Sequence, residues 1–322
     1  MSIKAGIAAN DAEGRCFLGL DVGGSQTRWA LATSSGAIFE QDSAAGFSGV
    51  RLNDDAEIRV VGDRLHAIAD VVNRLQRGLR LCRVHAGVTG IGADAPHMIA
   101  VMARVFAVGA NQVSVTSDAE LVYRAVFEPG EGYLVYAGTG SIAAFVTEAG
   151  ALLRAGGRGV MLDDAGGGYW IAREALRRIW RRDDEQPDAW HASPMAHELF
   201  ARVGGESSIF SARFLIEQER GAVGMLALVV AAHAHHDALA AEILRDAGVE
   251  LARLASAMTA RYGKRKIVVT GRASQLHASI ESAMRGALPA DALIEFQQVH
   301  AHVAAARMAA EKYLVSDLQA RP

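Results

Sequence analysis

The chain has 322 residues, and at about 100–200 residues per domain this length favours two domains over one. Hydrophobic residues make up 51% and charged residues 21%, with 33 glycines and 6 prolines, which excludes a disordered or collagen-like chain. The net charge of −3 provides no basic excess for nucleic acid or an anionic membrane. We therefore expect a globular protein that binds neither.

Cysteine content and apolar segments indicate the compartment. Cys16 and Cys82 are the only cysteines, too few for a disulfide framework or for a cysteine-based zinc or iron–sulfur site within one chain. The first residues lack the apolar segment of a signal peptide, and the longest apolar stretch, 222–232, is shorter than the ~20 residues that span a bilayer. We expect a cytoplasmic protein in a reducing compartment.

The first half of the chain predicts the element order βββαβαβα. Apolar positions Ile58, Val61 and Leu65 continue at steps of three and four, which is typical of an amphipathic helix ending near Gly78. Short apolar runs between turn residues predict strands. The predicted strands are 16–22, 27–33, 37–41, 83–88 and 112–116, and the predicted helices are 54–78, 96–106 and 118–127.

The same order starts again after Pro129. The predicted strands are 132–137, 142–147, 151–154, 266–270 and 293–296, and the predicted helices are 164–182, 272–285 and 299–313. Helical patterns fill the chain between 182 and 263, so we assign 183–262 to a helical insertion in the second unit. The sequence thus predicts an α/β fold of two similar units, with a ligand held between them.

A glycine-rich turn joins the first two predicted strands of each unit. The segment 20–27 (LDVGGSQT) places Asp21 at the end of a buried strand, before glycines and hydroxyls that can approach phosphate oxygens. Asp21 can hold Mg²⁺ through its waters. The alternative is a plain hairpin turn. The segment 136–141 (YAGTGS) repeats the pattern in the second unit, and this pairing favours phosphate binding over coincidence.

Asp118 follows a predicted strand and precedes a predicted helix. It is therefore expected at the carboxyl end of a sheet strand, where open α/β sheets bind their ligands. There it can serve either as a helix N-cap or as the base that takes a hydroxyl proton during phosphoryl transfer from ATP.

Two further segments carry polar clusters. The segment 156–170 (GGRGVMLDDAGGGYW) resembles a substrate cradle, although a flexible loop with an aspartate cap is the alternative. His233, His235 and His236 are too few for a four-ligand metal site, so a solvated helix face is favoured. The arginines between 173 and 182 are expected on the exposed side of an amphipathic helix.

In order and spacing, these segments resemble the N-acetylglucosamine/glucosamine kinase branch of the BadF/BadG/BcrA/BcrD ATPase family, within the actin–hexokinase–Hsp70 superfamily. The resemblance rests on LDVGGSQTRWAL, SVTSDAEL, YAGTGSIAAF, GGRGVMLDDAGGGYWIA and VVTGRASQL, and it extends from about residue 16 to 314. It implies two ribonuclease-H-like domains, 15–118 plus 299–322 and 119–298, with ATP and sugar in the cleft between them. It further implies a cytoplasmic homodimer acting on an amino sugar, with ATP and Mg²⁺ as cofactors.

The resemblance also assigns roles to single residues. Asp118 matches the catalytic base, and Asp21 lies near Mg²⁺. The residues implied to bind the nucleotide are Gly23, Gly24, Ser25, Gln26, Thr27, Gly138, Thr139, Gly140 and Gly271. The residues implied to bind the sugar are Ser141, Gly157, Arg158 and Asp164.

Two departures from the family pattern bear on the substrate. The segment Asp163 to Gly167 replaces the usual Gly-Asp-Glu-Gly-Ser, and Arg158 stands where N-acetylglucosamine kinases carry tryptophan. A buried unpaired arginine cannot be satisfied by an acetyl group, so we expect glucosamine to be preferred, with Asp163 holding Arg158 and Asp164 holding the sugar.

Other functions remain as alternatives. An activator ATPase of the BadF type would need cysteines placed to hold an iron–sulfur cluster, and a sugar-sensing repressor would need a helix-turn-helix before the first glycine turn. A catalytically inactive sugar-binding protein is the third alternative, because of Ala165 and the altered loop. ATP hydrolysis with and without amino sugar separates all three from a kinase.

Overall fold

The computed structural model describes residues 14–24, 26–49, 54–75, 78–92 and 94–319. The chain divides into two compact units: unit 1 holds 1–125 and 300–322, and unit 2 holds 126–299. The sequence placed the first boundary after residue 118, one residue into a helix that the structure keeps whole in unit 1. That helix, α4 (Asp118–Arg124), stays there because it packs against strands of unit 1.

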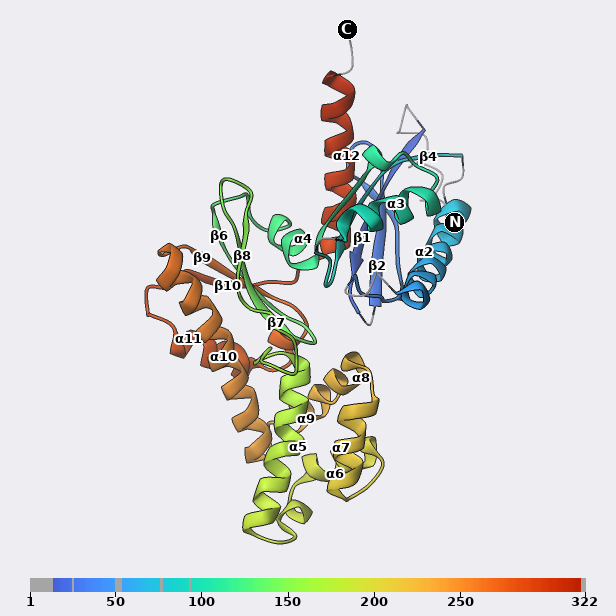
Figure 1. Ribbon diagram of the computed structural model, residues 1–322. Helices are drawn as coiled ribbons and strands as arrows, with labels where there is room; N and C mark the ends of the chain where they lie inside the picture. Colours follow the sequence, from blue (N-terminus) through green and yellow to red (C-terminus); the bar gives the residue numbers. More distant parts are fainter. Residues whose placement is uncertain (1–13, 25, 50–53, 76–77, 93, 320–322) are drawn as a thin grey trace, which may run out of the picture. The chain divides into compact units, whose positions relative to one another are not determined.

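Unit 1 is built on a five-stranded mixed sheet (Figure 1). Its strands are β1 (Arg15–Val22), β2 (Gln26–Ala32), β3 (Ile38–Ala45), β4 (Arg80–Val88) and β5 (Val113–Ser117), in the order β3-β2-β1-β4-β5. The first three strands form an antiparallel meander, and β4 and β5 run parallel to β1. The carboxyl ends of β1, β4 and β5 therefore lie at the same edge of the sheet.

Helices cover both faces of this sheet. The helices α2 (Asp55–Leu75) and α3 (Ala95–Val105) bury apolar side chains, such as Leu65 and Met98, against β1, β2 and β4. The opposite face carries α4 and the C-terminal helix α12 (Ala301–Gln319). Helix α12 approaches β1 so closely that a Cβ on Gly19 would lie 2.1 Å from the backbone nitrogen of Ala306. This face is consequently lined by alanines of α12.

Unit 2 repeats the same sheet. Its strands are β6 (Gly132–Ala137), β7 (Ser141–Val146), β8 (Leu152–Gly156), β9 (Lys266–Thr270) and β10 (Ile294–Phe296), in the order β10-β9-β6-β7-β8. Reversed and numbered within the unit, this is the order of unit 1, with the same parallel and antiparallel pairs. The predicted α/β class and the duplicated unit are therefore confirmed.

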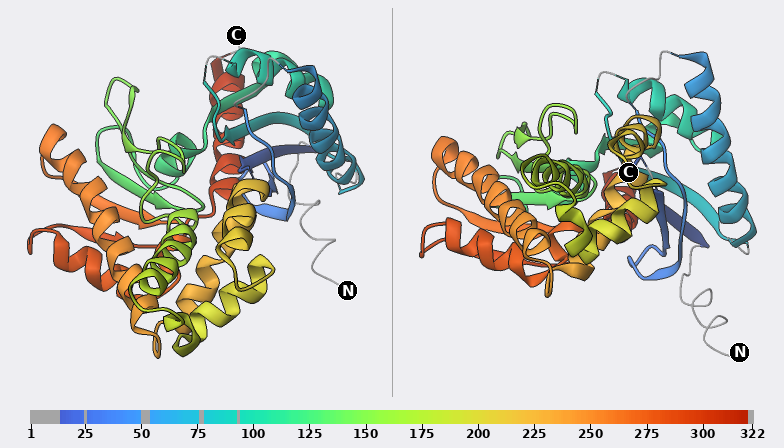
Figure 2. Two further views of the ribbon diagram at one scale, coloured as in Figure 1. Left: turned by 60° about the horizontal axis from the view of Figure 1, so that its bottom comes forward. Right: turned by 90° about the horizontal axis from the view of Figure 1, so that it is seen from below.

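The helices of unit 2 differ from the expectation. Most lie between β8 and β9: α5 (Gly168–Glu185), α6 (Pro194–Val203), α7 (Ser208–Glu217), α8 (Arg220–Met225), α9 (Ala227–His233) and α10 (Ala238–Tyr262), with a short 3₁₀ turn at Ala189–Ala192. The sequence included α10 in an insertion, yet α10 packs against β6, β7, β8 and α11 (Ala278–Ala287). Figure 2 shows α10 and α11 side by side. Helix α10 therefore covers the sheet, and α5 packs instead against α8, α9 and α10.

Two helical details also correct the sequence-based expectation. The predicted helix 272–285 is a 3₁₀ turn at Ala273–Gln275 followed by α11. Not all arginines of α5 lie on its solvent-exposed side, because the side chain of Arg178 is only 17% exposed and forms ion pairs with Glu174, Glu242 and Asp246. Arg178 thus links α5 to α10.

Within the described residues, no single helix has the length and apolar character to cross a membrane. The segments 220–233 and 238–262 meet those criteria only when they are taken together, and the chain bends by 118° between them.

Candidate active site

In unit 1, two carboxylates lie at the carboxyl ends of β1 and β5, the two strands on either side of β4. Asp21 stands near the end of β1, in register with Gly87 of β4, and Asp118 follows β5 as the first residue of α4. The N-cap of α4 is Ser117, whose hydroxyl accepts from the N–H of Glu120 at 3.1 Å. One oxygen of Asp118 accepts from the N–H of Ala119 at 2.8 Å, and its side chain also bonds to that of Thr89.

Burial disfavours the ionised form of both carboxylates. Burial, then repulsion by Asp118, raises the pKa of Asp21 from 3.8 to about 6, against the opposing charge of Arg28. Burial also raises the pKa of Asp118, although hydrogen bonds from Ala119 and Thr89 act against it. Both side chains retain some contact with solvent. An oxygen-lined site that disfavours two negative charges suits a hard divalent cation such as Mg²⁺.

Gly87 explains why α4 can bring Asp118 to this edge. A Cβ at Gly87 would lie 2.6 Å from side-chain atoms of Leu121, so only glycine lets α4 pack against β4 at this distance. The sequence reasoning missed Gly87. The available signal was a glycine inside an otherwise apolar strand, which often marks a close approach of another segment.

The first glycine turn joins β1 to β2. The N–H of Gly23 donates to the carbonyl of Gln26 at 3.0 Å, and Gly24 is exposed beyond it. Ser25 lies outside the described residues. Thr27 is fully buried on the side of β2 that carries the core residue Trp29, and within the described chain its hydroxyl has no hydrogen-bond partner.

In unit 2, the turn between β6 and β7 is attached to the start of α5. The N–H groups of Gly168 and Tyr169 donate to the carbonyls of Gly138 (2.8 Å) and Thr139 (2.9 Å), so the turn caps this helix with its carbonyls. The N–H groups of Thr139 and Gly140 find no partner in the described part of the chain. Such free backbone N–H groups are the donors that a phosphate group requires.

Several glycines let neighbouring segments approach this turn. A Cβ at Gly140 would lie 2.3 Å from a carboxylate oxygen of Asp164, and a Cβ at Gly271 would lie 2.3 Å from the carbonyl of Ala137. Gly271 also has a φ of +102°. Ser141 is 3% exposed and donates to the carbonyl of Ala165 at 2.6 Å, which ties the turn to the following loop.

Asp164 lies in the loop before α5 rather than at the start of that helix. It is 6% exposed, adopts a φ of +54°, and accepts from the N–H of Gly159 at 3.0 Å. Burial raises its pKa, whereas the N–H of Gly159 and the charge of Arg220 oppose this rise. In this structure, Asp164 holds the glycine loop that contains Gly157 and Arg158.

Asp163, the expected partner of Arg158, forms its ion pair with a different arginine. Asp163 pairs with Arg253 of α10 at 3.1 Å, and Arg158 is exposed. The premise of a buried, unpaired arginine is therefore wrong, since water solvates this guanidinium. Arg253 was missed because it lies 90 residues further along the chain.

His233, the last residue of α9, and His236 in the following turn form a small polar network. His233 contacts His236 at 3.0 Å and Glu198 of α6 at 2.8 Å. Across the described residues, no group of three or more His, Cys, Asp and Glu side chains is arranged to hold a metal ion.

Together, these features define a class of protein. Each unit has the same sheet order, unit 1 carries two buried carboxylates at the carboxyl edge of its sheet, and unit 2 carries a turn with free N–H groups. This is an α/β protein with duplicated sheets whose sites suit phosphate and a divalent cation.

The sequence pattern of the BadF/BadG/BcrA/BcrD ATPase family matches residues 18–306. The chain belongs to this family, and the resemblance found in the sequence is confirmed. A curated relative, the N-acetylmuramic acid/N-acetylglucosamine kinase of Clostridium acetobutylicum, is 28% identical over 172 residues, which cover 52% of this chain and 55% of that protein. The match therefore spans about half the length of the curated relative.

Solved structures share the fold. A "Putative N-acetylglucosamine Kinase" from Chromobacterium violaceum has a TM-score of 0.66 at 22% identity, and one from Porphyromonas gingivalis has 0.70 at 14%; each match covers 92% of this chain and 99% of the other. A ROK family glucokinase from Streptomyces griseus, in complex with glucose and AMPPNP, has 0.58 at 13%, covering 92% and 98%. At these identities the similarity establishes the two-domain fold alone.

Proposed function

We propose that this protein is an ATP-dependent kinase that phosphorylates a hydroxyl of an amino sugar, of the glucosamine or N-acetylglucosamine type. The observation that carries the proposal is the position of Asp118, at the carboxyl end of β5, beside a second carboxylate at the end of β1. The family and the named relatives support the choice of ATP and of a sugar.

ATP, when bound with Mg²⁺, supplies the phosphoryl group and the positive charge that balances its oxygens. In this proposal, Thr139 and Gly140 donate backbone N–H groups to phosphate oxygens. In the first turn the exposed Gly24 does the same, whereas Gly23 lets the backbone approach the phosphate closely. Gly271 keeps the backbone around Ala137 free of a side chain. Asp21 helps to hold the cation, which stabilises its ionised form.

Asp118 acts as the general base. The sugar hydroxyl transfers its proton to the Asp118 carboxylate while its oxygen bonds to the γ-phosphorus, and the bond from that phosphorus to the β,γ-bridging oxygen breaks to release ADP. Burial raises the pKa of Asp118, which strengthens it as a base near neutral pH. Asp164 acts less directly, because it holds the glycine loop with Arg158, and that loop presents the sugar contacts.

The decisive experiment compares Asp118→Asn with Asp70→Asn, an exposed aspartate of α2 in the same unit. Removing the base should lower kcat by on the order of 10²–10⁴ and leave nucleotide affinity nearly intact. Asp70→Asn should keep the wild-type kcat. An Asp118→Asn enzyme that retains more than half of the wild-type kcat would contradict the assignment.

A panel of sugars identifies the substrate. ADP release is measured with glucosamine, N-acetylglucosamine, N-acetylmuramic acid and glucose, and kcat/KM is compared across them. ATP hydrolysis that no sugar stimulates would favour an activator-type ATPase, and the absence of any ATP hydrolysis would favour a sugar-binding protein.

A further inference from the structure

Arg28 of β2 lies directly across the sheet from Asp21. The antiparallel register of β1 and β2 pairs these two residues, and on its other side Arg28 is paired with Ser43 of β3. Side chains that are directly opposite in an antiparallel pair stand on the same face, with their Cβ atoms about 4.5–5.5 Å apart. Arg28 therefore stands beside one of the two carboxylates of the candidate active site.

The face that carries Arg28 is the one covered by α12. The next residue, Trp29, belongs to the core under α2 and α3, whereas Ala30 packs with the alanines of α12. Successive side chains of a strand point to opposite faces, so Arg28 shares the face of Ala30. Gly19, two residues before Asp21, also meets α12. Arg28 and Asp21 thus share this face at the edge where β1 ends, and Arg28 is half-buried there.

In the part of the chain that the structure describes, the side chain of Arg28 forms no ion pair and no hydrogen bond. Asp21 is the acid directly opposite, and the charge of Arg28 lowers its pKa, but burial and repulsion by Asp118 outweigh this effect. Ser43, on the other side, is neutral. A guanidinium presents five N–H donors in a planar fork that matches carboxylate and phosphate oxygens. These donors are available to an anionic ligand.

Three charged groups follow one another along this edge of the sheet. Arg28 of β2 lies next to Asp21 of β1, and β4 separates Asp21 from Asp118, which follows β5. Three strand spacings of about 4.8 Å place the backbones at Arg28 and Asp118 about 14 Å apart. Helices α4 and α12 cover the same face, so the three side chains belong to one side of the sheet. A phosphoryl group above Asp21 has the proposed base on one side and Arg28 on the other.

We propose that Arg28 is a catalytic residue that binds the oxygens of the transferred phosphoryl group, an inference that rests on the proposed kinase function. The guanidinium donates N–H groups to the non-bridging oxygens of that group, on the side away from Asp118. In the transition state, negative charge is spread over these oxygens, and a fixed cation beside them lowers the barrier. ADP lacks this phosphoryl group and gains little from Arg28.

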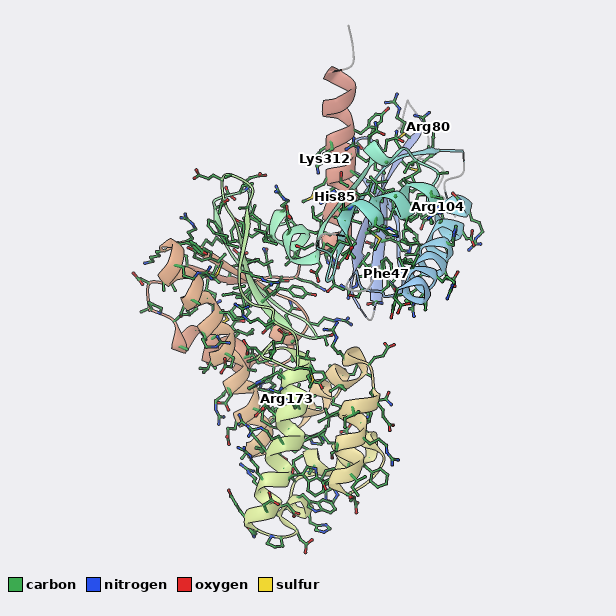
Figure 3. The ribbon with its side chains drawn as sticks, in the orientation of Figure 1. Phe47, Arg80, His85, Arg104, Arg173 and Lys312 are labelled. Atoms are coloured by element: carbon green, nitrogen blue, oxygen red, sulfur yellow. The ribbon has the colours of Figure 1, made fainter. Side chains whose placement is uncertain are left out.

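Nucleotide binding by the full chain separates the transferred phosphate from the other two. ADP and the ATP analogue AMPPNP, each with Mg²⁺, are titrated by calorimetry into wild type, R28Q, R28K and R104Q. Arg104, labelled in Figure 3, is an exposed arginine of α3 on the opposite face of the sheet and serves as the matched control.

The loss should be specific to the analogue. We expect R28Q to bind AMPPNP at least roughly 10-fold more weakly than wild type, and to bind ADP nearly as wild type does. Its kcat should fall by on the order of 10²–10³. R28K keeps the charge without the planar fork and should lie between R28Q and wild type, while R104Q should match wild type in all three measurements.

A second measurement does not depend on R28Q folding. In wild type, the Nε–H resonance of Arg28, assigned by its loss in R28K, should shift with AMPPNP and stay near its free position with ADP. A resonance that AMPPNP leaves unmoved would overturn the proposal, as would a folded R28Q with wild-type kcat or with equal losses of affinity for ADP and AMPPNP. A wild-type protein that binds neither nucleotide would instead refute the kinase function itself, and the role of Arg28 with it.

Discussion

Replacing Asp21 by asparagine should make the protein more stable at neutral pH. The folded state raises the pKa of Asp21 from 3.8 to about 6, because burial and the neighbouring Asp118 both disfavour its charge. The folded protein therefore holds this proton more tightly than the unfolded chain does. The resulting destabilisation is absent well below pH 4, grows between about pH 4 and pH 6, and is complete above pH 6.

The size of the effect follows from the shift. About two pKa units, at about 1.4 kcal/mol each, set a ceiling of about 3 kcal/mol, and screening by solvent reduces this to about 1–2 kcal/mol. Asp21→Asn removes the charge with little change in volume, so it should recover most of that amount at pH 7.5 and little of it at pH 4.

Urea unfolding, followed by circular dichroism at both pH values, measures the difference. Mg²⁺ provides a second comparison, since it should stabilise wild type more than Asp21→Asn if Asp21 helps to hold the cation. A variant that is less stable than wild type at pH 7.5, or a gain that is equal at both pH values, would refute the electrostatic argument.

Two other substitutions test local packing. Gly271→Ala should destabilise the protein by about 2–4 kcal/mol, because the new Cβ would press on the carbonyl of Ala137 at a positive φ. The control Gly150→Ala, at a φ of +82° in open space, should cost only about 1–2 kcal/mol. Equal decreases of the thermal midpoint in the two variants would contradict this expectation. Arg178→Ala should cost about 1–3 kcal/mol by weakening the link between α5 and α10, while the exposed Arg181→Ala stays within about 0.5 kcal/mol. Burial raises the pKa of Glu174, but Arg177 and then Arg178 outweigh it and hold that pKa below 4.5. The share of the Arg178 contribution that comes from Glu174 is therefore present above pH 4.5 and is lost as the pH falls further, which urea titrations at pH 7 and pH 4 detect.

Local patterns in the sequence were sufficient for the succession of strands along the chain and for the repetition of one unit. The alternation of apolar runs with turn residues predicted each strand to within a few residues, and the steps of three and four predicted α2. The glycine turn after the first strand of each unit followed from the order of residues in the segments 20–27 and 136–141. The roles of Asp21, Asp118 and the two turns in catalysis and binding remain predictions.

Tertiary contacts decided which elements and side chains meet. A helical period marks α5 and α10 alike, but only packing shows that α10 covers the sheet. Asp163 follows a glycine loop, yet its partner is Arg253, far along the chain. The sequence predicted separate roles for Asp21 and Asp118, but not that folding would bury Asp21 close enough to Asp118 for both effects to raise its pKa. The physical reason is range: periodicity and turn chemistry act over a few residues, whereas burial and charge depend on segments that only the folded chain brings together.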